Sequence, residues 1–145
     1  MTRQSLFLLT LAACSATFAE ESNLDPNHRF AWGENIGWTN WVHERPEPFN
    51  GVIVGADFLT GFIWGENVGW INAEPALSGT PIAQGVTVSG AGVTGYMWGE
   101  NIGWINLSCQ NNGTCAGTGN YGVTNDGLGN LGGYAWGENV GWISF

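Results

Sequence analysis

The sequence predicts an all-β protein in which four tandem Trp- and Gly-rich repeats form one compact domain. One twelve-residue frame, with two Trp six residues apart around Gly-Glu-Asn, occurs four times: "FAWGENIGWTNW" at 30–41, "FIWGENVGWINA" at 62–73, "YMWGENIGWINL" at 96–107 and "YAWGENVGWISF" at 134–145. The segments around the frame are short, rich in aromatic and β-branched residues, and bounded by Gly, Asn, Pro or Asp, as strands are. No segment after the N-terminal region has the 3.6-residue apolar period of a helix.

The first Trp of each frame falls at positions 32, 64, 98 and 136, so the period is 32, 34 and then 38 residues. Periods of this length indicate a repeat architecture. Each full unit has a Val-rich segment, a segment that enters the first Trp and one that leaves the second. The Val-rich segments are 51–55, 85–90 and 121–125, and the repeats span about 30–50, 51–84, 85–120 and 121–145. We expect two- or three-stranded units in one domain over 30–145, arranged as a propeller, barrel or solenoid.

The N-terminus is typical of an export signal over residues 1–19. "MTRQ" supplies the positive charge, an apolar stretch follows, and Thr17-Phe18-Ala19 ends in a small residue. Leu11-Ala12-Ala13-Cys14 also resembles a bacterial lipobox, in which Cys14 would carry a lipid anchor. The apolar run is too short for a permanent membrane span. Both alternatives predict an exported protein, extracellular, periplasmic or on the outer surface, with 20–29 as an N-terminal segment before the repeats.

The charge of the chain restricts its partners. The formal net charge is −9, Lys is absent, and the only Arg residues are Arg3, Arg29 and Arg45. Nucleic-acid affinity comes largely from Lys and Arg that displace counterions from phosphates, so we exclude a nucleic-acid partner. Neutral glycans, cations such as calcium, or another surface protein remain as partners.

The remaining cysteines predict a disulfide. Cys109 and Cys115 flank five residues rich in Gly and Asn, which can turn back on themselves. An oxidising compartment outside the cytoplasm would close the bridge. A metal site is the alternative, and it lacks further Cys or a nearby His.

The repeated frame predicts a β-hairpin, and the length of its turn decides which side chains face inward. A four-residue turn at 34–37 places Trp32 on an apolar core face with Phe30, Thr39 and Trp41, and likewise Trp64, Trp98 and Trp136 in the later repeats. The opposite face then carries the second Trp beside an amide, a candidate sugar platform formed by Trp38, Asn40, Trp70, Asn72, Trp104, Asn106 and Trp142. A five-residue turn would instead pair Trp32 with Trp38 on one face, and the two registers are mutually exclusive.

The ends of the array leave two arrangements open. Repeat 1 has no Val-rich strand before it, and an unpaired terminal edge favours aggregation. The first and last repeats would close a ring, barrel or small propeller within one molecule, or they would meet head to tail between molecules as a homo-assembly. Trp41 occurs in repeat 1 alone and is expected to pack at the end of the array.

The residues give little support for catalysis. His28 and His43 lie outside the repeated frame, and the repeated Glu residues would have identical surroundings, whereas acid–base catalysis needs groups in differing ones. We therefore expect no enzyme activity and no cofactor. The turn glutamates Glu34, Glu66, Glu100 and Glu138 would lie on one rim, so calcium binding is an alternative function. The competing interpretation is a solvated turn residue followed by an Asn suited to turns.

The frames "YMWGENIGWINL" and "YAWGENVGWISF", each after a Gly-Val strand, resemble the GYAW-x-EN-x-GWI-x-F repeats of uncharacterised bacterial secreted and cell-surface proteins. The resemblance covers most of 30–145 and implies export and a repeat β fold. It implies no activity and no binding residue. Repeat 1 departs from the pattern, with Thr39 in place of Ile and no preceding strand. We expect a non-enzymatic interaction or adhesion module that binds a glycan, the alternative being a structural surface protein that self-assembles through its incomplete end repeats.

Overall fold

A computed structural model describes residues 22–43, 51–74, 85–90, 92–116, 120–128 and 130–145. The export signal and Cys14 lie outside these residues. The described chain is all-β apart from one 3-10 turn, η1 (Cys109–Asn112). The strands are β1 (Phe30–Gly33), β2 (Gly37–Asn40), β3 (Ile53–Val54), β4 (Phe58–Thr60), β5 (Phe62–Gly65), β6 (Gly69–Asn72), β7 (Val86–Ser89), β8 (Gly92–Gly99), β9 (Gly103–Asn106), β10 (Val123–Asn125), β11 (Leu131–Gly137) and β12 (Gly141–Ser144).

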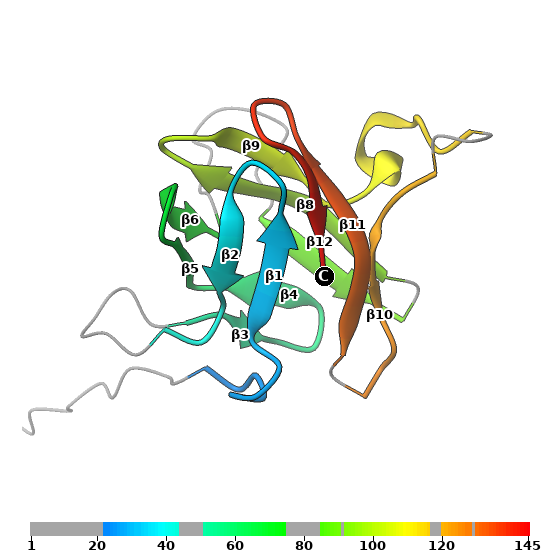
Figure 1. Cartoon of the computed structure of the whole chain (residues 1–145). Coiled ribbons are helices and arrows are strands. Elements are labelled where there is room, and N and C mark those ends of the chain that lie inside the picture. The colour runs from blue at the N-terminus through cyan, green and yellow to red at the C-terminus, as the bar shows by residue number, and fades with distance from the viewer. Residues whose placement is uncertain (1–21, 44–50, 75–84, 91, 117–119, 129) are drawn as a thin grey trace, which may run out of the picture.

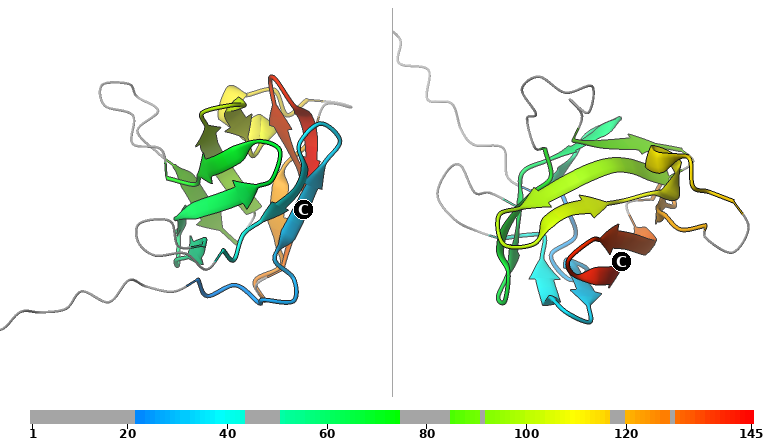
Figure 2. Two further views of the ribbon diagram at one scale, coloured as in Figure 1. Left: turned by 60° about the vertical axis from the view of Figure 1, so that its left-hand side comes forward. Right: turned by 90° about the horizontal axis from the view of Figure 1, so that it is seen from above.

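The four repeated frames are four antiparallel hairpins that close an eight-stranded barrel. The hairpins β1–β2, β5–β6, β8–β9 and β11–β12 join side by side through the pairs β2–β5, β6–β8, β9–β11 and β12–β1. Seen from above, they surround a common interior (Figure 2). The first and last repeats therefore pair within one molecule, which confirms the closed arrangement. The head-to-tail alternative loses its basis, because these end strands are already paired.

The register of the hairpins corrects the expected four-residue turn. Trp32 pairs directly with Trp38, and Gly33 pairs with Gly37, so the turn that includes both glycines has five residues. The other three hairpins have the same register, in which the two Trp of each frame are cross-strand partners. Both Trp therefore point away from the barrel, and the prediction that Trp32, Trp64, Trp98 and Trp136 form the core was wrong.

Small and aliphatic side chains occupy the inside of the barrel instead. On the entering strands these are Ala31, Ile63, Met97 and Ala135, and on the leaving strands they are Thr39, Ile71, Ile105 and Ile143, all buried. A void of only about 10 Å³ remains among these side chains. Eight strands make a barrel just wide enough for side chains to fill, and indoles at every inward position would overfill it.

Repeat 1 places a polar residue inside this barrel and satisfies it. The hydroxyl of Thr39 donates to the carbonyl oxygen of Ala31 at 3.1 Å and accepts the indole N–H of Trp41 at 3.3 Å. Buried polar groups are tolerated when they are hydrogen-bonded. Trp41 itself is buried and lies edge-on to Phe145, with ring centroids 5.0 Å apart. The expected packing of Trp41 at the end of the array, where the first and last repeats meet, is confirmed.

The turn of each frame folds one aliphatic side chain back into the core. In the first hairpin Ile36 is buried, and a Cβ on Gly33 would lie 2.8 Å from its Cγ1. Gly37 adopts a φ of 71°, a conformation that glycine takes without a steric penalty. Val68, Ile102 and Val140 are buried at the same position of the later turns. The two glycines of the frame thus create the space and the backbone bend for this aliphatic residue.

The turn asparagines connect neighbouring hairpins into a closed ring of hydrogen bonds. The side-chain N–H of Asn67 donates to the carbonyl oxygen of Ile36 at 3.3 Å, and the same bond recurs at each junction. The other three bonds are Asn101 to Val68, Asn139 to Ile102 and, across the closure, Asn35 to Val140, at 3.0, 3.1 and 3.0 Å. The Asn in each Gly-Glu-Asn turn therefore links two neighbouring hairpins of the barrel.

A second sheet of β3, β4, β7, β10 and the first halves of β8 and β11 extends the barrel at the end away from these turns (Figure 1). The three Val-rich segments predicted as strands form β3, β7 and β10. Glycines fix where the sheet meets the barrel, since a Cβ on Gly95 would overlap the carbonyl oxygen of Gly85. At the β3 edge, the side chain of Asn23 accepts from and donates to the backbone of Val54 at 2.8 and 2.9 Å, as a neighbouring peptide would.

The disulfide between Cys109 and Cys115 is present and closes the loop after β9. Cys109 is the first residue of η1, and Asn111 of η1 lies beside β8. The Asn111 side chain accepts from the N–H of Gly95 at 2.9 Å and donates to its carbonyl oxygen at 2.7 Å. Asn111 thus pairs with the backbone of Gly95 as a strand residue would, and the disulfide stabilises this insert of repeat 3.

Candidate functional site: an exposed aromatic face on the barrel

Each hairpin carries three aromatic side chains on its outer surface. The two Trp of a frame pack against each other in three of the repeats, with ring centroids 4.7–4.8 Å apart and ring planes 58–67° apart. The Phe or Tyr two residues before the first Trp then lies edge-on to the second Trp, at 6.1–6.4 Å in all four repeats. Such tilted and edge-on arrangements are favourable for aromatic pairs.

Two neighbouring hairpins leave these rings open to solvent. We call this surface the aromatic face, and its residues, between 37% and 63% exposed, are Phe30, Trp32, Trp38, Tyr134, Trp136 and Trp142. The hairpins are adjacent because β12 pairs with β1, with Ser144 opposite Trp32. Since Tyr134 pairs with Ser144 and Trp32 with Trp38, one row across four strands reads Tyr134, Ser144, Trp32, Trp38. Ser144 thus places a small polar side chain between Tyr134 and Trp32 in this row.

The size of the aromatic face is unusual for a surface. Its exposed fractions together amount to about three whole aromatic side chains, or roughly 600 Å² at about 200 Å² each. Scattered exposed apolar residues are normal, whereas a contiguous patch near the upper end of the usual range marks an interaction site. The register of β12 with β1 brings these residues together from opposite ends of the sequence.

The other two hairpins are not equivalent to this pair. Trp64, Trp70, Trp98 and Trp104 are only half-exposed. The imidazole of His43 is stacked on Trp64 and edge-on to Trp70, with ring centroids 6.1 and 5.3 Å away. The four equivalent platforms expected from the repeat are therefore two open hairpins and two whose Trp residues are less exposed, of which one is partly covered by His43. Of the second Trp residues, Trp38 and Trp142 are the exposed members.

The candidate asparagines beside the second Trp form hydrogen bonds to the backbone at the ends of their strands. Asn40 and Asn72 accept the backbone N–H two residues onward, from Val42 at 3.1 Å and Glu74 at 2.8 Å, and so end their strands in a turn. Asn106 does the same for Ser108 and is buried. Any ligand contact by these residues would be made by the side-chain NH₂, because the oxygen is engaged. In the fourth repeat the equivalent residue is Ser144.

The glutamates expected on one rim are exposed at the four turns. Each of Glu34, Glu66, Glu100 and Glu138 precedes an Asn of the ring of hydrogen bonds, and all four are exposed. Within the described residues, no group of three or more His, Cys, Asp or Glu side chains lies close enough together to hold a metal ion. Calcium binding by these glutamates therefore has no assembled ligand set among the residues described.

The aromatic face carries one cationic group and several neutral hydroxyls. Arg29 is the only Arg or Lys among the described residues, and its guanidinium lies over the Phe30 ring at 5.3 Å from the centroid. Tyr121 packs edge-on against Trp142 at 5.2 Å, and burial followed by the charge of Tyr96 raises the pKa of its hydroxyl. Tyr121 is therefore a neutral hydrogen-bonding group near physiological pH. The aromatic face combines flat apolar rings with neutral hydroxyls from Ser144 and the tyrosines.

Trp32 and Trp136 were predicted to lie in the core, although one pattern in the sequence favours the outward direction. Every turn contains Ile or Val at the position before the second Gly, at 36, 68, 102 and 140. An aliphatic β-branched residue in a tight turn is expected to be buried, and burying it requires the register in which the glycines pair. That register directs both Trp outward.

No family model matches the chain, and no curated protein or solved structure is significantly similar to it. In the part of the chain that the structure describes, no helix is long and apolar enough to cross a membrane.

Proposed function

We propose that this protein is an exported, non-enzymatic binding module that holds a neutral glycan against the aromatic face. The observation that carries the proposal is the contiguous exposure of six aromatic side chains on β11–β12 and β1–β2. A sugar ring has an apolar C–H face that stacks on an indole and hydroxyls that bond to neutral polar groups. Trp and Tyr suit such surfaces because they combine a large apolar area with a polar group.

The spacing of the rings supports an extended ligand. Tyr134 on β11 and Trp32 on β1 lie on either side of Ser144 on β12, about two inter-strand spacings or roughly 10 Å apart. One short oligosaccharide can therefore contact both groups, and a polymer can bind several molecules at once. Weak contacts that act together on one chain give useful overall affinity. The disulfide between Cys109 and Cys115 is compatible with export.

The charge of the chain supports a neutral ligand over an acidic one. With a net charge of −9, the protein repels anionic polymers, and Arg29 is the only Arg or Lys among the described residues. Ligand pockets depend on a few placed polar groups on an apolar surface, and the aromatic face has that composition.

The test is affinity electrophoresis in native gels that contain a soluble neutral glycan, with hydroxyethyl cellulose, glycol chitin, glucomannan and laminarin as the panel. We expect at least one glycan to retard the protein, and Trp38→Ala with Trp142→Ala to weaken the retardation at least tenfold. Trp70→Ala with Trp104→Ala is the matched control, because these second Trp residues belong to the covered hairpins.

Two results would contradict the proposal. One is an unchanged mobility with every glycan in the panel. The other is a stable dimer in size-exclusion chromatography with light scattering that Trp142→Ala dissociates, which would assign the aromatic face to a second copy of the chain.

A further inference from the structure

A cavity lies at the end of the barrel opposite the Gly-Glu-Asn turns. Its volume is about 360 Å³, within the range of small-molecule sites. Phe30 belongs both to the wall of this cavity and to the aromatic face, where it contacts Trp38. A ligand on the aromatic face can therefore continue into the cavity without leaving contact with the protein.

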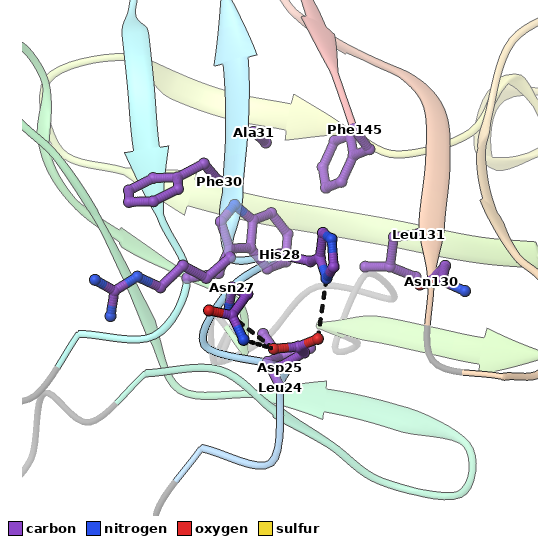
Figure 3. A pocket seen from close by; sticks show the side chains of 11 residues that line it. Leu24, Asp25, Asn27, His28, Phe30, Ala31, Asn130, Leu131 and Phe145 are labelled. Atoms are coloured by element: carbon purple, nitrogen blue, oxygen red, sulfur yellow. Dashed lines mark hydrogen bonds and ion pairs between the residues drawn. The ribbon is translucent and has the colours of Figure 1, made fainter.

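The floor of the cavity is apolar and closed. Ala31, Trp41 and Phe145 form it at the base of the barrel, whose interior is filled. Two separate segments build the walls, as Figure 3 shows: Asp25, Asn27 and His28 come from the segment before β1, and Asn130 and Leu131 come from the start of β11. A ligand chain cannot pass through the barrel, so the cavity accommodates one or two sugar rings only.

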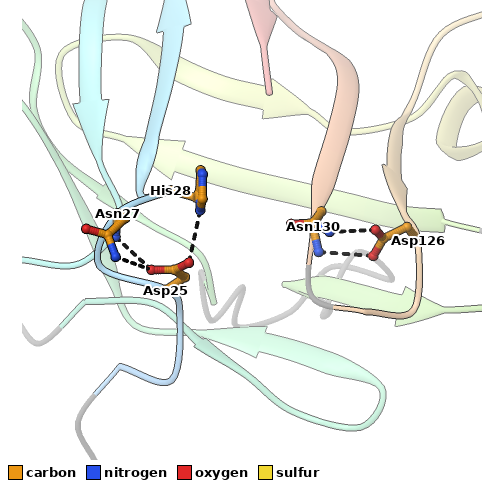
Figure 4. Close-up of polar contacts among 5 residues, drawn as sticks. All are labelled: Asp25, Asn27, His28, Asp126 and Asn130. Carbon is orange, nitrogen blue, oxygen red and sulfur yellow. Dashed lines mark hydrogen bonds and ion pairs between the residues drawn. The ribbon is translucent and has the colours of Figure 1, made fainter.

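A carboxylate organises the polar groups in the first wall. Asp25 accepts the backbone N–H of Asn27 at 2.8 Å and its side-chain N–H at 3.1 Å, and its other oxygen lies 2.9 Å from Nδ1 of His28 (Figure 4). The Asn27 backbone N–H, followed by His28, lowers the pKa of Asp25 below its ordinary value, so the carboxylate remains an acceptor. In neutral His28, this bond fixes the proton on Nδ1 and leaves Nε2 as an acceptor.

The opposite wall repeats this arrangement. Asp126 accepts the backbone N–H groups of Leu128 at 2.7 Å and Asn130 at 3.1 Å, and the Asn130 side-chain N–H at 2.6 Å. The Asn130 side chain, followed by the Leu128 N–H, lowers the pKa of Asp126. Both carboxylates thus accept several protein N–H groups. The groups left for a ligand are three neutral acceptors, the side-chain oxygens of Asn27 and Asn130 and Nε2 of His28, together with the cationic Arg29, which also lines the cavity.

We propose that this cavity binds the terminal sugar of a neutral glycan, with its hydroxyls donating to Asn27, His28 and Asn130 and its apolar face on Phe30 and Phe145. Three neutral acceptors above an aromatic floor suit a ligand rich in hydroxyl donors, and Arg29, which also lines the cavity, is a donor for the oxygens of such a ligand. This inference rests on the proposed glycan function and adds that the protein recognises chain ends.

The test is NMR with ¹⁵N-labelled full chain and D-glucose, D-galactose, D-mannose and N-acetylglucosamine, each titrated to 100 mM. We expect at least one sugar to shift the side-chain amide signals of Asn27 and Asn130 and the imidazole signals of His28. His28→Ala with Asn130→Ala is expected to reduce the shift of the Asn27 side-chain amide, the reporter that this variant keeps, at least fivefold. Trp70→Ala with Trp104→Ala serves as the control and is expected to retain the shifts of all three residues. The indole N–H signal of Trp41 reports whether each variant is folded.

The outcomes separate this inference from the function on which it rests. If a glycan polymer is retarded through the aromatic face but no monosaccharide shifts the cavity signals, the terminal-sugar pocket is wrong and the proposed function stands. An Asn27 side-chain shift that persists undiminished in a folded His28→Ala, Asn130→Ala variant also overturns the pocket. If neither polymer nor monosaccharide binds, both proposals fail.

Discussion

Replacing Gly95 with Ala is expected to be among the most destabilising single-methyl changes in this protein. Gly95 has a φ of 99°, and a Cβ there would overlap the backbone carbonyl oxygen of Gly85. Backbone atoms cannot rotate away as a side chain can. Relief would require β8 to separate from its neighbours where Gly95 accepts from Leu107 at 3.1 Å and pairs with the Asn111 side chain.

The size of the effect follows from these contacts. An L-residue in a left-handed conformation costs about 1–2 kcal/mol. Lengthening or losing two or three hydrogen bonds adds about 1 kcal/mol each. The expected loss in the free energy of unfolding is therefore about 3–5 kcal/mol, a large share of the roughly 5–15 kcal/mol that stabilises a typical domain.

Urea unfolding followed by tryptophan fluorescence measures this loss, and Gly90→Ala is the matched control. Gly90 lies just after β7, and a Cβ there would have no neighbour within 4 Å. We expect this control to change the unfolding free energy by less than about 1 kcal/mol, with stabilisation as the favoured sign because Ala restricts the unfolded chain. A Gly95→Ala protein within 1 kcal/mol of wild type would refute the argument, as would a Gly90→Ala protein equally destabilised.

Three other predictions concern the disulfide, the register and the Asp25 carboxylate. Replacing Cys109 and Cys115 by Ser should lower the unfolding free energy by about 2 kcal/mol, since the bridge closes a short loop, and adding reductant to wild type should reproduce most of that loss in urea titrations. Met97→Ala should lower the free energy of unfolding by about 2–5 kcal/mol, because Met97 is buried in the barrel. Trp38→Ala should lower it by less than about 1 kcal/mol, because Trp38 points outward. The reverse order of these two losses in thermal or urea unfolding would contradict the register. Because the pKa of Asp25 is lower in the folded than in the unfolded chain, its carboxylate stabilises the folded state above pH 3.8, and this contribution disappears as the pH falls through the lower folded value. A ¹³C carboxyl titration of folded protein in which Asp25 has its midpoint at or above pH 3.8 would exclude this stabilising contribution.

The fold class and the repeat pattern can be predicted from the sequence because they depend on residues close together along the chain. The recurrence of the frame predicts four hairpins, and the Val-rich segments at 51–55, 85–90 and 121–125 mark the outer strands. Cys109 and Cys115 are close enough along the chain to predict their bridge. Closure of the ring could be stated only as an alternative, because pairing of β1 with β12 joins segments more than a hundred residues apart.

The direction of the tryptophans could not be settled by hydrophobicity. Both faces of each hairpin are apolar, with Trp32 on one and Ala31 with Ile36 on the other, so strand alternation gives no preference. What decides is the volume inside eight short strands, which suits Ala, Ile and Met and leaves no room for eight indoles. The candidate site was therefore only partly predictable. Trp38 and Trp142 were candidate ligand contacts from the sequence, but the aromatic face that they form with Trp32 and Trp136 depends on the barrel closing.

The ring of asparagine bonds does not by itself limit how many repeats this molecule can contain. Each turn donates to the preceding turn and accepts from the next, so every unit has one junction of each kind and a fifth would find equivalent partners. A fifth hairpin would nevertheless raise the strand number to ten, and barrel diameter grows with strand number. The short side chains of Ala31 and Ala135 would then face a hollow. Copy number in this protein is thus a property of interior volume, set residue by residue through the sizes of the inward side chains.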